Sequence, residues 1–217
     1  MISTALERIS LEDRESWLKG RNTQGIGASE AAIVLGVSKW STPLELWKQK
    51  RGIAPQKDIS NNPAVAFGVL SEPHIRALFQ IQHPELEVEY HEFDLLYQTE
   101  RPWLFATLDG ELTDKETGAK GVLEIKTASP QSREDWRAWD GQTPYYPQVC
   151  HQLLATGYDF VYLYALLMGG EGKGYLRTYL YTRKNAKDDM EYLLSAEERF
   201  YSENIIGGKM PSAKLKI

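Results

Sequence analysis

The stretch that decides the fold reads GVLEIKT at residues 121–127. In an extended strand successive side chains point to opposite faces. Glu124 and Lys126 therefore share one face, whereas Leu123 and Ile125 share the other. An apolar face of this kind is typical of a strand inside a sheet, where a carboxylate and an ammonium need partners. We expect a central β-sheet that carries a charged site on one face of this strand.

The preceding segment reads FATLDG at residues 105–110 and brings a second carboxylate, Asp109, to a glycine turn about one hairpin away. Two carboxylates at a sheet edge repel each other unless they bind a hard divalent cation. Lys126 beside them can position or help deprotonate a water and stabilise charge on a phosphate. An isolated Glu-x-Lys pair is usually a surface ion pair worth ~0–1 kcal/mol, but the combination with Asp109 predicts metal-assisted phosphodiester hydrolysis. Glu111, on the same strand face, is the alternative to Asp109.

Composition narrows the kind of metal site. Hydrophobic residues make up 42% and charged residues 25% of the 217 residues, as in ordinary globular proteins. Cys150 is the one cysteine, and the four histidines lack the i, i+4 zinc spacing, which argues against disulfides, iron–sulfur clusters and zinc. We therefore expect Mg²⁺, with Mn²⁺ as a substitute, among carboxylates. The net charge of −5 excludes no DNA partner, because a basic groove can be local.

No apolar run approaches the roughly 20 residues that a membrane helix needs, and the N-terminus is charged where a signal peptide would be apolar. These features predict a cytoplasmic protein with no membrane partner.

Hydrophobic periodicity predicts helices followed by strands and then further helices. The expected helices span residues 11–20, 29–35, 43–50, 63–79, 133–139, 146–156 and 184–200, and the expected strands span 86–97, 103–112, 122–127, 160–168 and 174–182. A capping box at Thr42–Glu45 begins the third helix, and Gly52 and Gly157 follow helix ends. This order predicts an α/β (α+β) domain with one central mixed sheet flanked by helices.

The order Asp109, Glu124, Lys126 is the signature of the PD-(D/E)xK nuclease superfamily. The wider pattern between Arg21 and Gln148 resembles the YqaJ-like viral recombinase family, to which phage lambda exonuclease belongs. The resemblance implies a restriction-endonuclease-like core and a single nuclease domain over residues 1–217. Residues 1–60 would form a helical N-terminal segment with a phosphate-binding motif, and residues 61–217 the catalytic core.

Motifs before the central strands extend the resemblance. The segment RNTQGIGASE at 21–30 is similar to the family motif in which an arginine and a serine bind a terminal 5′-phosphate, here Arg21 and Ser29. Ser29 is also a plausible helix cap, and the alternative is that it only caps while Arg21 is solvated. In the segment 38–47, Lys39 and Trp40 are candidate DNA contacts by charge and stacking. The alternative for Trp40 is packing on its own domain.

The remaining site residues follow from the same resemblance. FGVLSEP at 67–73 matches a Gly-x-x-x-Glu motif and implies Glu72 at the active site, on a helix that Pro73 should bend. YYPQVCHQ at 145–152 matches a glutamine motif and implies a catalytic Gln148. Gln152 lies one turn further on as the backup, and the intervening His151 is better explained as structural.

The sequence departs from the superfamily signature at one point: the proline that precedes the catalytic aspartate is absent before Asp109. Leu108 stands there, and the preceding Thr107 is a further candidate DNA contact. The resemblance also implies that the Ile125 carbonyl completes a metal site with Asp109 and Glu124.

The leading hypothesis is a two-metal-ion exonuclease that digests linear double-stranded DNA 5′ to 3′ from phosphorylated ends. It would leave 3′ single strands for phage-type recombination in a bacterial host cytoplasm. The resemblance implies a trimer and a single-strand annealing protein as partner. The alternatives are an endonuclease of the same superfamily, acting in repair or restriction, and a non-catalytic DNA-end-binding protein. The single cysteine excludes a Cas4-like enzyme with an iron–sulfur cluster.

Overall fold

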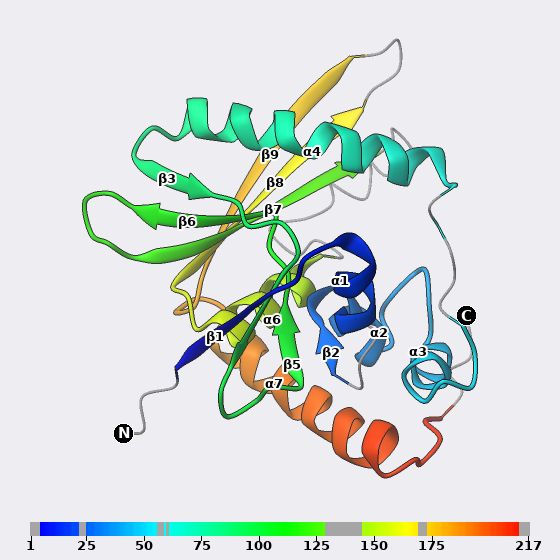
Figure 1. The fold of residues 1–217 in the computed structure, drawn as a ribbon. Coiled ribbons are helices and arrows are strands. Elements are labelled where there is room, and N and C mark those ends of the chain that lie inside the picture. The colour runs from blue at the N-terminus through cyan, green and yellow to red at the C-terminus, as the bar shows by residue number, and fades with distance from the viewer. Residues whose placement is uncertain are drawn as a thin grey trace.

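The computed structural model describes residues 5–21, 25–55, 59, 61–128, 145–168 and 173–212. The expected helix at 133–139 and most of the loop at 169–173 lie outside these ranges. Helices surround two mixed sheets (Figure 1). The strands are β1 (Leu6–Ser10), β2 (Ile26–Gly27), β3 (Leu86–Glu89), β4 (Asp94–Gln98), β5 (Leu104–Ala106), β6 (Gly110–Asp114), β7 (Lys120–Ala128), β8 (Phe160–Met168) and β9 (Gly174–Thr182). The α-helices are α1 (Arg14–Arg21), α2 (Ala31–Val34), α3 (Pro43–Lys50), α4 (Pro63–Gln82), α6 (Tyr146–Thr156) and α7 (Lys187–Arg199), with a 3₁₀ turn η1 (Ala28–Glu30) and a π-helical turn η4 (Phe200–Ile206).

The expected mixed α/β class is confirmed, but the single central sheet is wrong. The smaller sheet has the order β1-β4-β5-β2 and the larger one β3-β6-β7-β8-β9. Pairing is parallel between β2 and β5 and between β7 and β8, and antiparallel elsewhere. The N-terminal segment, expected to be helical, also supplies β1 and β2.

Two segments that we expected to be single strands each divide between the sheets. Residues 86–97 leave the larger sheet after β3 and enter the smaller one as β4, through a link in which Phe93 has a φ of 64°. Residues 103–112 return by the opposite route, from β5 to β6. Residues 107–109 make this second crossing, so Asp109 lies where the chain passes from one sheet to the other.

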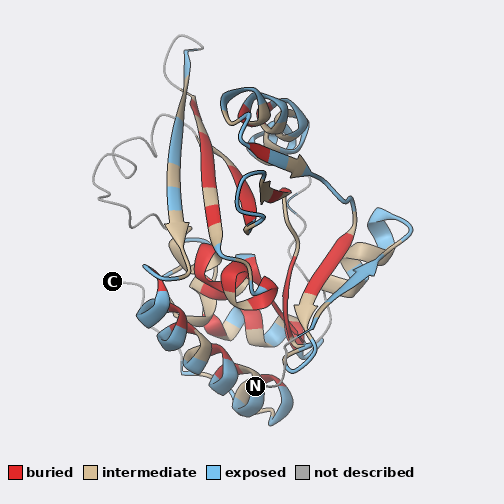
Figure 2. Cartoon of the chain, turned by 90° about the vertical axis from the view of Figure 1, so that its left-hand side faces the viewer, coloured by how far each residue is buried: buried red, intermediate tan, exposed pale blue. Residues whose placement is uncertain are grey.

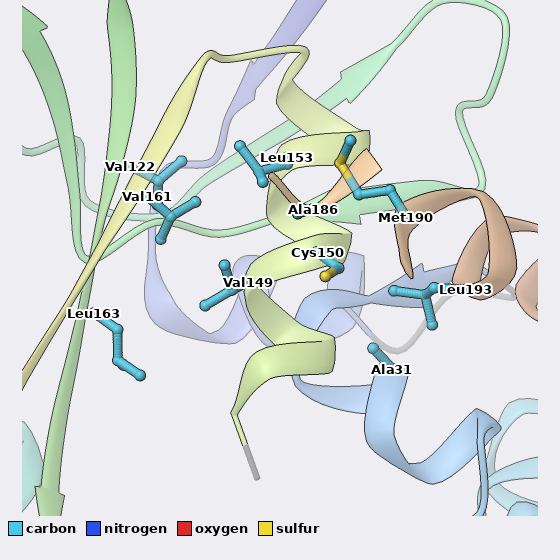
Figure 3. Packing of buried hydrophobic residues seen from close by; sticks show 10 residues of the cluster. All are labelled: Ala31, Val122, Val149, Cys150, Leu153, Val161, Leu163, Ala186, Met190 and Leu193. Carbon is cyan, nitrogen blue, oxygen red and sulfur yellow. The ribbon is translucent and has the colours of Figure 1, made fainter. Parts of the chain in front are cut away.

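Strand β7 is covered by a helix on each face, as the alternation of its side chains requires. Leu123 and Ile125 pack with Ile75 and Phe79 of α4. On the other face Val122 packs into a cluster with apolar residues of α6 (Figure 3). Helix α4 therefore covers the outer face of the larger sheet, and α6 covers the inner face.

Helix α6 lies between the two sheets and forms the centre of the molecule. Its residues contact β8 and β7 on one side and β5 and β4 on the other, while α7 packs along it. Figure 2 shows the resulting concentration of buried residues along α6 and β8. The helix ends at Gly157, whose φ of 75° is left-handed, as expected for a glycine that stops a helix.

The predicted start of α3 is also confirmed. The Thr42 hydroxyl accepts a hydrogen bond from the Glu45 amide, and the Glu45 carboxylate accepts one from the Thr42 amide at 2.8 Å. Gly52, with a φ of 68°, follows this helix. Helix α4 continues through Pro73 as one element from Pro63 to Gln82. Within the described part of the chain, α4 included, none of the helices combines the length and apolar character needed to cross a membrane.

Candidate functional site

Asp109 lies against β7, beside the charged side chains Glu124 and Lys126 that the strand carries on its inner face. Its Oδ2 atom accepts a hydrogen bond from the Ile125 amide at 2.7 Å. Gly110 pairs with Leu123, which brings Asp109 level with Glu124 on the neighbouring strand. Burial raises the pKa of the Asp109 carboxyl well above its ordinary value, and the negative charges of Glu124 and Glu72 raise it further. The three carboxylates therefore act on one another electrostatically.

Glu124 is only 2% exposed and is surrounded by donors. Its Oε1 atom accepts a hydrogen bond from Gln148 at 2.6 Å, and its Oε2 atom accepts one from Gln152 at 2.5 Å. The two glutamines are one turn apart on α6, so the same helix face presents both amides to this carboxylate. Gln152 is fully buried, whereas Gln148 keeps part of its surface exposed. Gln148 is therefore the more accessible of the two.

Lys126 forms an ion pair with Glu124, on the strand face that the alternation predicted. Its ammonium also lies over the ring of Tyr145, 5.1 Å from the centroid. Burial opposes the charge, but the carboxylates of Glu124 and Asp109 raise the pKa of Lys126 above its ordinary value. A permanently charged Lys126 is suited to stabilising an anion rather than to removing a proton from water.

Glu72 approaches the same strands from α4 and is held by Arg76, one turn further along the helix. The Arg76 Nη2 atom lies 2.5 Å from the Glu72 carboxylate. Burial raises the pKa of Glu72, Arg76 and Lys126 oppose this shift, and the charge of Glu124 adds to it. Arg76 was not among the predicted site residues. The available signal was its i, i+4 spacing from Glu72, which is common on exposed helices.

The alternative ligand Glu111 is engaged elsewhere. Its carboxylate lies 2.5 Å from the Arg8 guanidinium and accepts a hydrogen bond of 2.5 Å from the Tyr158 hydroxyl. Asp109, by contrast, faces Glu124 and Glu72. The geometry thus favours Asp109 over Glu111, although the signature's proline is missing before it.

The donor chemistry at this site fits a hard divalent cation, because three carboxylates raise one another's affinity for positive charge. Within residues 5–128, 145–168 and 173–212, as far as they are described, no three acidic, histidine or cysteine side chains converge closely enough to hold an ion by themselves. Glu124 is bonded to Lys126 and to both glutamines, and Glu72 is bonded to Arg76.

A cleft of about 900 Å³ opens beside this cluster and joins the N-terminal motif to the central strands. Its lining includes residues from α1, η1, α3, α4 and β7. The predicted residues among them are Arg21, Ser29, Trp40, Glu72, Asp109, Ile125 and Lys126.

At one end of the cleft, Arg21 donates a hydrogen bond of 3.3 Å to the Ser29 hydroxyl. Burial lowers the pKa of Arg21, while the charges of Glu30, Asp109 and Glu124 oppose that shift. The guanidinium therefore lies within the electrostatic reach of the carboxylate cluster. The structure brings the predicted arginine–serine pair together in the same cleft as the central strands.

The expected cap role of Ser29 is wrong. Ser29 lies inside the 3₁₀ turn η1, and Gly27 occupies the cap position. The Glu30 carboxylate accepts a hydrogen bond from the Gly27 amide at 2.9 Å and pairs with the Lys50 ammonium at 2.9 Å. Lys50 also donates to the Arg21 carbonyl at 3.3 Å. This buried lysine, which sequence reasoning missed, ties α3 to the segment that presents Arg21.

Trp40 is 67% exposed at the cleft, which argues against packing as its whole role. One face of its ring stacks on Tyr145, with centroids 6.1 Å apart and planes 22° from parallel. Lys39 is exposed; burial raises the pKa of Tyr145, and the positive charge of Lys39 opposes that rise. Thr107 is half-buried and is not one of the described residues that line the cleft.

His151 is fully buried away from the cleft. One ring nitrogen is 2.7 Å from the Glu197 carboxylate and the other is 2.9 Å from the Phe105 carbonyl. Burial lowers its pKa, but Glu197 and the two hydrogen bonds produce a net rise. His151 thus links α6, α7 and β5, as expected of a structural residue.

Comparison with solved structures agrees with this architecture. The fold is shared with that of an alkaline exonuclease, LHK-Exo, from Laribacter hongkongensis, at 20% identity and a TM-score of 0.63, over 89% of this chain and 95% of that one. The same enzyme in complex with dAMP matches at 20% identity and a TM-score of 0.63, over 90% and 96% of the two chains. The class is thus that of the alkaline-exonuclease fold, with a carboxylate–lysine cluster beside a cleft.

The family follows from the sequence itself. Residues 16–159 match the model of the YqaJ-like viral recombinase domain, and the chain belongs to that family. It is 30% identical over 209 residues to the uncharacterized protein YqaJ of Bacillus subtilis (strain 168), a match that covers 95% of this chain. The chain spans 61% of the length of that relative.

Proposed function

We propose that this protein is a Mg²⁺-dependent exonuclease that degrades linear double-stranded DNA 5′ to 3′ from phosphorylated ends, by a two-metal-ion mechanism. The observation that carries the proposal is the shared cleft. It holds the Arg21–Ser29 pair, suited to a terminal phosphate, together with Asp109 and Lys126, suited to phosphodiester hydrolysis. The exonuclease activity and the dAMP complex of LHK-Exo, which has the same fold, support it.

The site residues would divide the chemistry between them. Asp109, Glu124 and the Ile125 carbonyl would hold the metal, with Glu72 close by. When bound, Mg²⁺ supplies Lewis-acid polarisation of the phosphate and acidifies a bound water. Lys126 carries a positive charge beside the scissile phosphate and stabilises its developing negative charge. Gln148 donates its amide without competing for the cation and orients the phosphate or the attacking water.

The phosphate end of the cleft would select the substrate. Arg21 can form paired charge-assisted hydrogen bonds to a terminal phosphate, and Ser29 adds a hydroxyl donor. The Lys50–Glu30 ion pair fixes the segments that present them. A 5′-phosphate held at this end places the adjoining phosphodiester toward Lys126, which gives the 5′ to 3′ polarity. Lys39 and Trp40 would contact the DNA by charge and stacking, and we retain Thr107 as a more distant candidate.

The decisive experiment compares three matched duplexes in Mg²⁺: linear with 5′-phosphates, linear with 5′-hydroxyls, and a covalently closed circle. We expect rapid loss of nucleotides from the phosphorylated 5′ ends, slower digestion of the hydroxyl ends, and no cutting of the circle. Equal cutting of circles and linear ends would instead indicate the endonuclease alternative. Binding of ends without cleavage by the parent protein would indicate the non-catalytic alternative.

Arg21→Ala separates the exonuclease from the endonuclease in a second way. Loss of a charge-assisted contact costs about 1.5–3 kcal/mol, or roughly 10- to 150-fold. We expect the variant to lose that factor on phosphorylated ends and to show little change on hydroxyl ends. An endonuclease needs no phosphate pocket and would be unaffected on both.

The assembly and the cellular setting belong to the same proposal. We propose a homo-oligomer, a trimer, that acts in the cytoplasm of a bacterial host, from a phage or prophage origin, together with a single-strand annealing protein. Helix α4 supports self-association, because it exposes large apolar side chains that contact with another copy would remove from water. These residues are Phe67, Val69, Leu70, Leu78 and Ile81. Light scattering during size-exclusion chromatography tests the trimer, and Leu70→Glu should disrupt it.

A further inference from the structure

Arg76 makes three directed contacts that join three separate elements. Its Nη2 atom bonds the Glu72 carboxylate at 2.5 Å, and its Nε atom donates to the Asp109 carbonyl at 2.5 Å. The face of the guanidinium lies over the ring of Tyr90, 3.6 Å from the centroid. The partners come from α4, from the crossing between β5 and β6, and from the link between β3 and β4.

These contacts distinguish Arg76 from an ordinary helical ion pair. An exposed Glu–Arg pair at i, i+4 contributes little and leaves both side chains mobile. The Arg76 side chain is only 13% exposed, and its bond to Asp109 spans 33 positions of the sequence. Arg76 therefore connects Glu72 to the backbone of Asp109, and both of these carboxylate residues line the cleft.

The chemistry of the contacts requires arginine. A guanidinium is planar, donates in several fixed directions and stacks on aromatic rings, whereas an ammonium is a compact point charge. Lysine at position 76 can replace the charge beside Glu72. It cannot at the same time bond the Asp109 carbonyl along the edge and present a flat face to Tyr90.

We propose that Arg76 is a positioning residue that holds Glu72 and the Asp109 segment in fixed relation, and so sets the affinity of the cleft for its divalent cation. The inference rests on the proposed nuclease function. Removal of groups that orient metal ligands typically costs 10- to 100-fold in metal affinity or activity. We expect a loss of that size, expressed in the metal dependence and not in DNA binding.

The test compares Arg76→Met and Arg76→Lys with the parent protein. Arg101→Met is the matched control, because Arg101 pairs with Glu198 at 3.6 Å on the surface. Three quantities are measured: the Mn²⁺ concentration for half-maximal cleavage, the dissociation constant of Mn²⁺ without DNA by calorimetry, and the affinity for DNA ends in Ca²⁺. Thermal unfolding checks that each variant is folded.

We expect Arg76→Met to weaken both Mn²⁺ constants by about 10- to 100-fold, Arg76→Lys to weaken them in the same direction, and Arg101→Met to leave them unchanged. Affinity for DNA ends should stay at the parent value in all three. If Arg76→Met does not fold, the Mn²⁺ constants of Arg76→Lys test the proposal. Folded variants with parental Mn²⁺ constants would overturn the proposal.

A second background shows whether Arg76 acts through Glu72. In Glu72→Gln the guanidinium has lost its charged partner, so adding Arg76→Met should weaken Mn²⁺ binding by much less than it does in the parent. Equal loss in both backgrounds would overturn the claim that Arg76 positions Glu72 and would leave only its bond to the Asp109 carbonyl as the route. The failure of the nuclease proposal is distinct from either result: the parent itself would then neither bind Mn²⁺ nor cleave DNA, and the inference would fall with it.

Discussion

The buried pair of His151 and Glu197 allows a prediction of stability that is independent of the proposed function. Replacing His151 by leucine keeps a side chain of similar bulk but removes both polar contacts. Glu197 is then a buried carboxylate without its partner, and its Oε2 atom already has no hydrogen-bond partner in the described structure. Breaking a buried pair on one side costs about 3–5 kcal/mol. We therefore expect His151→Leu to lower the free energy of unfolding by about that amount.

The double variant His151→Leu, Glu197→Leu separates the charge from the packing. Apolar replacement of both partners is often close to neutral, and what remains is the Phe105 carbonyl without its donor, at about 1–3 kcal/mol. The double variant should thus be more stable than His151→Leu alone. Urea unfolding gives the free energies of unfolding of the parent, the single variant and the double variant, provided that the dependence on urea concentration has the same slope in all three. In thermal unfolding the single variant should melt about 6–20 °C below the parent.

A surface pair of the same composition provides the control. The ring of His83 lies 2.9 Å from Glu85, where both side chains reach solvent. His83→Leu should lower the free energy of unfolding by less than His151→Leu, because Glu85 is exposed and stays solvated when its partner is removed. The reasoning is refuted if His151→Leu unfolds like the parent, or if removing Glu197 as well makes it less stable still.

The pair also predicts a pH dependence. The pKa of His151 is raised in the folded state: burial opposes the rise, but Glu197 and the hydrogen bonds outweigh it. A raised histidine pKa gives stabilisation that is complete below the unfolded value of about 6.5 and is lost as pH rises through the folded value. The difference in unfolding free energy between the parent and His151→Leu should therefore be largest below pH 6.5 and shrink at alkaline pH.

Six further substitutions probe the site and the fold. Asp109→Asn should reduce Mg²⁺-dependent cleavage by at least about 100-fold, whereas Glu111→Gln should leave cleavage measurable, as time courses on a phosphorylated duplex will show. Lys126→Met should lower the cleavage rate by about 10²- to 10³-fold and preserve DNA binding in Ca²⁺. Trp40→Ala should weaken binding of a single-stranded oligonucleotide by the loss of one stacked base, about 1–3 kcal/mol, and Trp40→Phe should retain part of it. Gly157→Ala should destabilise the protein by about 1–2 kcal/mol in thermal unfolding, because its φ is 75°.

Elements with a strong period and clear end signals were predictable from the sequence. Helix α6 begins and ends where the apolar spacing and Gly157 place it, and β8 and β9 have the expected bounds. The division into two sheets was not predictable. Alternation of side chains says that a segment is extended, but it does not say with which strands the segment pairs. Residues 86–97 and 103–112 therefore read as single strands and cross between sheets in the structure.

The same limit applies to the site. Alternation along β7 placed Glu124 and Lys126 on one face, and this prediction does not depend on which strands pair with β7. The roles of Arg76 and Lys50 were not predictable, because both residues stand in sequence contexts that are typical of exposed basic residues on helices. Their importance comes from contacts with residues far away in the chain, which a local pattern does not contain. Asp109 lies between these cases: its residue type and glycine turn were informative, but its position at the crossing between sheets was not.

The missing proline before Asp109 has a physical counterpart in these distant contacts. A proline would restrict the backbone of the crossing locally, through its fixed φ. Here the crossing is restrained from outside: the Asp109 carbonyl receives the Arg76 bond and its side chain receives the Ile125 amide. Both bonds hold Asp109 against structured elements on either side, α4 and β7. With its carbonyl held by Arg76 and its carboxylate held by the Ile125 amide, Asp109 keeps its place at the crossing although leucine stands at position 108.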